Sequence, residues 1–192
     1  MRIGRFVLLK GEEMSPYIPL PSIESLPKEI KEIVQAFPLN IYLMTANAPA
    51  SFKGLGELAR SILFESEFDP RKREIAVLRV AHVTQAIYEW THHVAVAKLY
   101  GLTDNEIEKI KTEDPVISLG DEGNLLCRVA DEISRNVRLG DEALTQTLSR
   151  YGVRGATELI LCVSYFNFIS RFLESTRVEL EKDGVFNMIH KT

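Results

Sequence analysis

Cysteine is scarce in this sequence of 192 residues, where only Cys127 and Cys162 are present. Both lie in apolar segments with helical periodicity, and a free thiol in such a place usually behaves as a small buried hydrophobic side chain. Two isolated cysteines do not make a disulfide framework, which favours a reducing compartment. Because they do not form a Cys-x-x-Cys pair, the common dithiol redox motif is also missing.

The sequence also lacks long hydrophobic runs and clusters of positive charge. No run approaches the roughly 18 apolar residues needed to span a bilayer, and the apolar run from Phe6 to Leu9 is too short for the hydrophobic region of a signal peptide. The 23 basic residues are outnumbered by 27 acidic ones, and no basic patch stands out. We therefore expect a cytoplasmic protein that binds neither membranes nor nucleic acids.

The composition is that of an ordinary globular protein, with 45% hydrophobic and 26% charged residues. Residues 1–27 contain four prolines without sustained periodicity, and we expect an extended N-terminal arm there. Residues 28–192 show helical periodicity and no strand-like alternation. They predict one all-α domain of about eight helices, the last of which begins after Gly152 and runs to about Leu180.

Several expected helix ends are marked by residues with a known capping role. Asp69 and Pro70 suit the N-cap and the first position of a helix. Thr103 and Glu106 have the spacing of a capping box. A break is expected between about residues 82 and 86, where helical regularity is lost.

Titratable residues gather in the segment 87–101, which is otherwise built mainly of Ala, Val and Leu. On a helix, Glu89 and His93 are i and i+4 neighbours and can hydrogen-bond on one face, with Trp90 between that face and the core. A carboxylate beside an imidazole favours the imidazolium and fixes its tautomer, as acid–base chemistry requires. The same spacing also occurs in purely structural helix pairs, so both interpretations stay open.

A metal site is a further interpretation of this segment. Glu89 and His92 match the Glu-x-x-His ligand pattern of di-iron helical bundles. Such bundles need the motif twice, and His190, the one histidine outside the region of residues 82–93, has no glutamate three positions before it. Because His92 and His93 point about 100° apart on a helix, a mononuclear site is also hard to build. We expect no metal and no other cofactor.

The runs R-E-I-A-V-L-R-V-A (73–81), Y-E-W-x-x-H (88–93) and A-x-x-x-G (97–101) resemble the carboxymuconolactone decarboxylase-like family of the AhpD-like (alkylhydroperoxidase D-like) superfamily. A looser resemblance extends over residues 120–180. The family resemblance implies an AhpD-like helical domain that assembles into a homo-oligomer, commonly a trimer or hexamer, with a dimer also possible. It also implies that the functional sites lie near subunit contacts. The last helix, which is apolar on more than one face, agrees with an oligomer.

The peroxidase branch of that superfamily carries Cys-x-x-Cys-x-x-x-His, with a glutamate 12 residues before the first cysteine. Aligning its histidine with His93 puts the two cysteine positions on Ala86 and Glu89. The tyrosine between the cysteines then falls on Tyr88, and the relay glutamate falls on Glu74. The acid–base residues are present and both thiols are absent, so the resemblance implies the non-redox branch and not a thiol peroxidase.

For that branch the resemblance implies cofactor-free acid–base chemistry, a decarboxylation or isomerisation, on a small organic acid or lactone. His93, poised by Glu89 or Glu74, would carry the proton, and Tyr88 would orient the substrate or its enolate oxygen.

Two further residues are substrate-binding candidates. Arg79 could supply the cation for a substrate carboxylate, and Trp90 lies within the same motif. Two alternatives to the enzyme remain. One is a non-catalytic helical assembly protein in which Glu89 and His93 are a structural pair, and the other is a peroxiredoxin- or alkylhydroperoxidase-type antioxidant with an unrecognised thiol.

Overall fold

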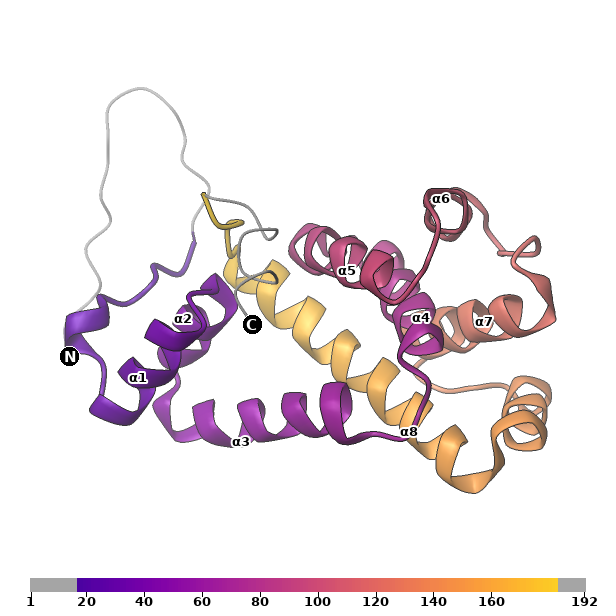
Figure 1. Ribbon diagram of the computed structural model, residues 1–192, viewed down its shortest axis with the longest axis horizontal. Coiled ribbons are helices and arrows are strands. Elements are labelled where there is room, and N and C mark those ends of the chain that lie inside the picture. Colours follow the sequence, from indigo (N-terminus) through magenta and orange to yellow (C-terminus); the bar gives the residue numbers. More distant parts are fainter. Residues whose placement is uncertain (1–16, 183–192) are drawn as a thin grey trace.

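The computed structural model describes residues 17–182, which contain eight α-helices and no β-strand (Figure 1). The α-helices are α1 (Lys28–Ala36), α2 (Asn40–Ala46), α3 (Pro49–Arg60), α4 (Pro70–Val83), α5 (Ile87–Leu99), α6 (Asp104–Thr112), α7 (Gly120–Asn136) and α8 (Asp141–Thr176). A short 3-10 helix, η1 (Ile23–Ser25), and a π-helical turn, η2 (Ser61–Glu65), complete the set. The predicted all-α class is confirmed.

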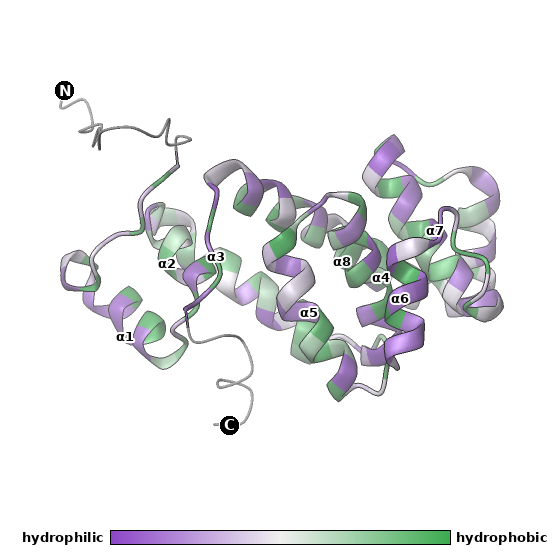
Figure 2. Ribbon diagram, turned by 90° about the horizontal axis from the view of Figure 1, so that it is seen from above, coloured by the Kyte–Doolittle hydropathy of each residue, from purple (hydrophilic) through white to green (hydrophobic). Residues whose placement is uncertain are grey.

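Helix α4 is the centre of the fold and packs against α5, α6, α7 and α8. Every residue from Arg73 to Ala81 is buried, so α4 has no solvent-facing side over this stretch. Because Arg73, Glu74 and Arg79 lie in that stretch, each charge needs a partner inside the protein. The outer helix α6 is coloured mainly as hydrophilic in Figure 2, as expected for a helix with one side in solvent. The core around α4 includes Val77, Leu78, Leu126, Val129, Leu159 and Val163.

Helix α8 runs through the molecule, with α1–α3 on one side of it and α4–α7 on the other (Figure 1). Gly152 interrupts it with a φ of 65°, a conformation that glycine adopts without steric cost. The long last helix therefore begins after Gly152, as predicted, and ends at Thr176 instead of Leu180.

By length and composition, α8 is also the one helix among residues 17–182 that could cross a membrane. However, 56% of its most apolar window is buried inside the protein. Since a central core helix has the same composition, packing against α4 and α7 explains its apolar character.

Residues 17–27 pack along α2 and the end of α8. The backbone N–H of Ile18 donates to the carbonyl of Thr176 at 3.2 Å, and the Asn47 side chain donates to the carbonyl of Pro19 at 3.0 Å. Residues 1–16 of the expected arm, and His190 at the other end of the chain, lie outside the described residues.

The predicted helix ends around the site are confirmed. The Asp69 side chain accepts from the backbone N–H of Lys72 at 2.9 Å, and Thr103 forms a reciprocal capping box with Glu106. The expected break in the helix lies between Val83, where α4 ends, and Ile87, where α5 begins. This short turn folds α5 back onto α4, so residues of the two helices meet.

Candidate active site

His93 on α5 lies between two carboxylates that come from two different helices. Its Nδ1 atom is 2.7 Å from Oε2 of Glu74 on α4, and its Nε2 atom is 3.5 Å from Oε2 of Glu89, one turn earlier on α5. The first distance is a short hydrogen bond, whereas the second is too long for a strong one. Nδ1 is therefore committed to Glu74, and Nε2 is the nitrogen that can donate to another acceptor.

The carboxylate of Glu74 is completely buried and has a second charged partner. Its Oε1 atom accepts from Nε of Arg73 at 3.0 Å, and the Arg73 side chain is itself only 4% exposed. Nη1 of Arg73 also donates to the carbonyl of Leu63 in η2 at 2.7 Å, and its guanidinium lies 5.5 Å from the ring centre of Tyr100. Arg73 and His93 thus neutralise one buried anion from two sides, as a charge in such a place requires.

The surroundings push the pKa values of the three central groups in definite directions. Burial would lower the pKa of His93, but the neighbouring Glu74 carboxylate outweighs it and raises the pKa above 6.5. Burial would raise the pKa of Glu74, but the charges of His93 and Arg73 outweigh it and lower the pKa below 4.5. Burial dominates for Glu89 and raises its pKa. These directions favour an imidazolium and a carboxylate in the pair, next to a second carboxyl group that keeps its proton to a higher pH than usual.

The imidazole of His93 is fixed in orientation but is not sealed off. It meets the ring of Phe166 on α8 edge to face, with ring centroids 4.8 Å apart. The His93 side chain keeps 11% of its surface exposed. A held imidazolium at the surface of a buried ion pair is a positioned proton donor.

Tyr88 belongs to a second cluster, and the partners of its hydroxyl and ring differ from those of His93. Its hydroxyl donates to Oε1 of Glu181 at 2.5 Å, and its ring stacks on His92 with centroids 4.3 Å apart. Nε2 of His92 lies 2.9 Å from the other carboxylate oxygen of Glu181. The expected catalytic residues are thus divided between two neighbouring clusters around α5. Glu74, Glu89 and His93 form the first, and Tyr88 joins His92 and Glu181 in the second.

Arg79 lies in neither cluster, because protein acceptors surround it. Its side chain has no exposed surface and donates to Asp131 at 2.6 and 3.0 Å and to Asp114 at 3.2 Å. Two more donor contacts, both 2.8 Å long, go to the carbonyls of Ile110 and Glu113. This placement gives Arg79 the role of joining α4 to α7 and to the end of α6, and it replaces our expectation that Arg79 binds a substrate carboxylate.

Trp90 is half-buried and lies on another side of α5. Its ring is near His82, with centroids 6.2 Å apart, and Nζ of Lys111 on α6 is 5.9 Å from the ring centre. Trp90 therefore contributes to the packing of α5 against α4 and α6.

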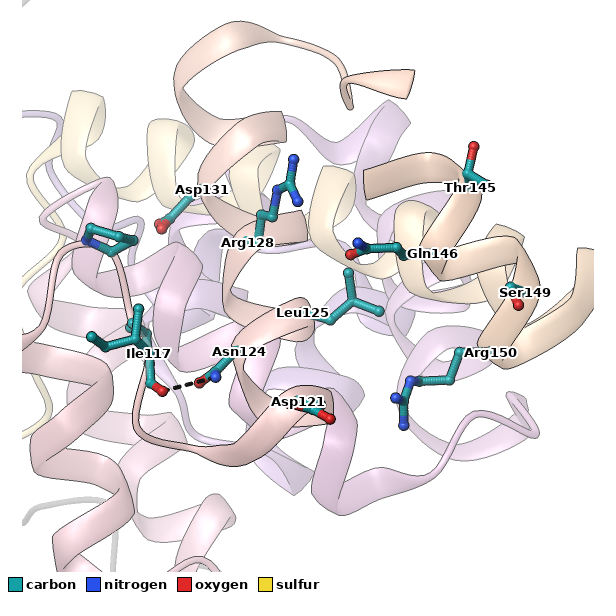
Figure 3. A pocket seen from close by; sticks show the side chains of 12 residues that line it. Ile117, Asp121, Asn124, Leu125, Arg128, Asp131, Thr145, Gln146, Ser149 and Arg150 are labelled. Carbon is teal, nitrogen blue, oxygen red and sulfur yellow. Dashed lines mark hydrogen bonds between the residues drawn. The ribbon is translucent and has the colours of Figure 1, made fainter. Parts of the chain in front are cut away.

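A groove of about 900 Å³ lies away from these clusters, between α7, the start of α8 and the loop before α7. Figure 3 shows Arg128 and Gln146 on facing helices of this groove, with Asp121 and Arg150 towards its other end. None of the residues that line it belongs to the His93 cluster or the Tyr88 cluster. The groove and the acid–base groups around His93 are therefore separate features of the molecule.

Sequence reasoning assigned no role to Arg73, Phe166 or Glu181, although each completes one of the clusters. A signal for Arg73 exists, because an adjacent Arg-Glu pair in an apolar helix needs internal partners. No comparable signal marks Glu181, which lies 89 positions after His92. Among residues 17–182, no group of three or more His, Cys, Asp or Glu side chains is arranged to hold a metal ion.

Comparison with known proteins relates one segment of the chain to a family and the whole fold to solved structures. Residues 49–121 match the model of the carboxymuconolactone decarboxylase family. This segment holds Glu74, Tyr88, Glu89 and His93. A comparison with curated proteins found no match.

Three solved structures share the fold. A peroxidase-related protein from Ralstonia eutropha with an alkylhydroperoxidase AhpD core superimposes with a TM-score of 0.74 at 14% identity, over 90% of this chain and 97% of that one. A peroxidase-related protein from a Silicibacter species gives 0.72 at 15% identity, over 93% and 98%.

The third, a putative antioxidant defence protein AhpD from Agrobacterium tumefaciens, gives 0.65 at 14% identity, over 71% and 94%. At these identities the likeness concerns the fold alone, and the similarity to the family is confined to the matched segment. The chain therefore has the fold of these AhpD-like structures and carries a segment, residues 49–121, that is similar to the carboxymuconolactone decarboxylase family.

Proposed function

We propose that this protein is a cofactor-free acid–base enzyme, a decarboxylase or isomerase, that acts on a small organic acid or lactone. The observation that carries the proposal is the position of His93, whose Nδ1 is held by a buried carboxylate while Nε2 is left for another acceptor. A general acid must be charged near working pH and fixed in orientation, and the raised pKa of His93 meets the first condition. The match to the carboxymuconolactone decarboxylase family supports the reaction class.

The proposed reaction needs one proton transfer from His93 to a substrate carbon. In a decarboxylation, the bond between the substrate carbon and its carboxylate breaks, carbon dioxide leaves, and the electron pair is held as an enolate. Nε2 of His93 then gives its proton to that carbon, and solvent returns a proton to the neutral imidazole. Glu74 holds the ring through Nδ1 throughout, and Glu89, with its raised pKa, can pass the returning proton to Nε2. An isomerisation uses the same groups, with removal of a substrate proton before its return.

The substrate class can be tested by a thermal-shift screen of carboxylated lactones, 3-oxo acids and hydroxy acids. A ligand at 100 times its dissociation constant stabilises the folded state by about 2.7 kcal/mol, which is readily visible in Tm. We expect at least one of these classes to raise the Tm of the wild-type protein in a saturable way, and to be turned over. A screen in which no member raises Tm would count against the enzyme.

A non-catalytic role for the cluster is the second proposal, and the burial of Glu74 favours it. A carboxylate with no exposed surface that joins α4 to α5 has a structural effect whatever else it does. In that role the protein would be a helical assembly protein, and the Arg73–Glu74–His93 contacts would serve only to hold α5 on α4.

An antioxidant function is suggested by the structural likeness to two peroxidase-related proteins and to an antioxidant defence protein AhpD. Cys127 and Cys162 are both buried, and burial raises the pKa of each thiol to about 12. Because the thiolate is the reactive form, thiol-based peroxide reduction is disfavoured in this chain.

We also propose that the protein is a homo-oligomer, in keeping with the family resemblance. Large apolar side chains are exposed on α8 and α5, among them Leu161, Phe168 and Ile87. Where such side chains form a contiguous patch, the patch is typical of a contact surface between chains. Size-exclusion chromatography with light scattering at micromolar concentration should give a trimer, hexamer or dimer, and a monomer would overturn this proposal.

A further inference from the structure

The segment after α8 turns back onto the other end of the molecule. Arg177 adopts a positive φ of 58°, and the backbone N–H of Val178 donates to the carbonyl of Leu173 at 3.2 Å. The side chain of Asn40 on α2 then donates to the carbonyl of Glu179 at 2.9 Å. These contacts bring the carboxylate of Glu181 to the place where α2 meets α5.

Three donors converge on that carboxylate. Its Oε1 atom accepts from the backbone N–H of Asn40 at 2.7 Å and from the hydroxyl of Tyr88 at 2.5 Å. Its Oε2 atom lies 2.9 Å from Nε2 of His92. Tyr88 and His92 are only 4% and 9% exposed. Both oxygens of the Glu181 carboxylate are thus contacted by groups of α2 and α5 that the fold holds in position.

The donors also stabilise the charged form of the bound group. Burial would raise the pKa of Glu181, but the hydrogen bonds from His92, Tyr88 and Asn40 outweigh it and lower the pKa to about 2. Charged acceptors form stronger hydrogen bonds than neutral ones. The surroundings of Glu181 therefore select an ionised carboxylate.

We propose that Asn40, Tyr88 and His92 form a carboxylate-binding site, which the chain's own Glu181 fills and which takes the carboxylate of a small organic acid when Glu181 leaves. The hydroxyl of Tyr88 has a single proton, and it is given to Glu181, while its oxygen accepts from the backbone N–H of Ile41 at 3.2 Å. Tyr88 cannot donate to a substrate oxygen in this arrangement. Glu181 is thus an internal competitor for any acid that binds Tyr88.

The site adjoins the His93 cluster but is distinct from it. Tyr88 and His92 each precede a residue of that cluster, Glu89 and His93, by one position on α5. Neighbouring positions on a helix point about 100° apart, so the two pairs occupy adjacent faces of α5. Binding of a carboxylate beside Tyr88 needs no turnover at His93, so the inference goes beyond the proposed function and is tested separately from it.

The experiment compares Glu181→Ala with Glu179→Ala and the wild type, all as full-length protein. Glu179→Ala removes the same charge from the same segment, but that side chain is exposed and its contact to Asn40 is through the backbone. Acetate is titrated against sodium chloride at equal ionic strength, and both Tm and the NMR signals of the His92 ring are followed.

We expect Glu181→Ala to bind acetate saturably, with a shift of the His92 signals and a rise in Tm, and at least about tenfold more tightly than the wild type, because the internal competitor is gone. Glu179→Ala should behave like the wild type, and adding Tyr88→Phe to Glu181→Ala should weaken acetate binding. The proposal is overturned if sodium chloride has the same effect as acetate, if no saturation occurs, or if Tyr88→Phe changes nothing. Should Glu181→Ala fail to fold, Glu181→Gln, which keeps the side-chain volume, is measured in its place with the same criteria.

Discussion

Nδ1 of His93 lies 2.7 Å from Oε2 of Glu74, a carboxylate that has no exposed surface and sits on the neighbouring helix. The two residues are 19 positions apart in the chain, and the turn between α4 and α5 brings them together. This contact links the stability of the core to the protonation of an imidazole that is flanked by two carboxylates.

Glu74→Gln should destabilise the protein by about 3–5 kcal/mol, because removing one partner of a buried ion pair leaves the other charges uncompensated. Urea unfolding of both proteins measures the difference. Glu57→Gln is a matched control, since the 3.8 Å pair of Glu57 with Lys53 is largely exposed and such pairs contribute about 0–1 kcal/mol. A loss for Glu74→Gln no larger than for the control would contradict the account of the buried pair.

The contribution of this pair should depend on pH in a defined way. The lowered pKa of Glu74 gives stability that is present above its unfolded value of 4.5 and is lost as pH falls through the folded value. The raised pKa of His93 gives stability that is present below 6.5 and is lost as pH rises through the folded value. The destabilisation by Glu74→Gln should therefore be greatest between pH 4.5 and 6.5. A difference that keeps growing up to pH 9 would contradict this sign.

Glu89→Gln should have the opposite effect on stability. Burial raises the pKa of Glu89, so the folded state disfavours its ionised form, and stability is lost as pH rises through the folded value. The variant should be at least as stable as the wild type at pH 8, with an advantage that shrinks towards pH 4.5. Denaturant curves at several pH values test this, and a variant that is clearly less stable at pH 8 would show that the ionised Glu89 holds His93 in place.

Arg79→Gln should lower the free energy of unfolding strongly without affecting substrate affinity. Its fully buried guanidinium serves Asp131, Asp114 and two carbonyls, and loss of a buried partner costs about 3–5 kcal/mol. Arg128→Gln, whose ion pairs are partly exposed, should cost about 1 kcal/mol or less. An unchanged Tm with a raised KM in Arg79→Gln would return Arg79 to the substrate-binding residues.

Replacement of both cysteines should leave peroxide consumption unchanged. Each thiol is buried and its pKa is raised to about 12, so thiol reagents should modify Cys127 and Cys162 only after unfolding. A coupled peroxide assay on the wild type and on Cys127→Ala/Cys162→Ala tests this. Peroxide reduction that disappears in the double variant would favour the antioxidant alternative.

The local features of the fold could be predicted because they depend on near neighbours. The capping box at Thr103, the N-cap at Asp69 and the start of the last helix after Gly152 all follow from residues within one turn of each other. The proximity of Glu89 and His93 follows from helical spacing in the same way. Glu74 was found only through the family resemblance, because no local rule joins positions on two helices.

The remaining contacts depend on tertiary structure that local patterns do not determine. Arg79 could be taken for a substrate ligand because its partner Asp131 lies 52 positions away, on α7. Tyr88 matched a family position, yet Glu181, 93 positions later, determines what its hydroxyl contacts. Both cases concern polar residues whose partners come from distant segments.

The most direct test of the central claim is the turnover of the acid identified by the thermal-shift screen, measured for wild type, His93→Gln and His82→Gln. His82 is a matched control, because it lies on α4 beside Trp90 and outside the His93 cluster. The account predicts that His93→Gln lowers kcat by about 10²–10⁴-fold, the usual contribution of a general acid or base, while His82→Gln stays near the wild type. Turnover by folded His93→Gln within about threefold of the wild type, far below that contribution, would contradict the account and leave the Glu74–His93 contact with a structural role alone.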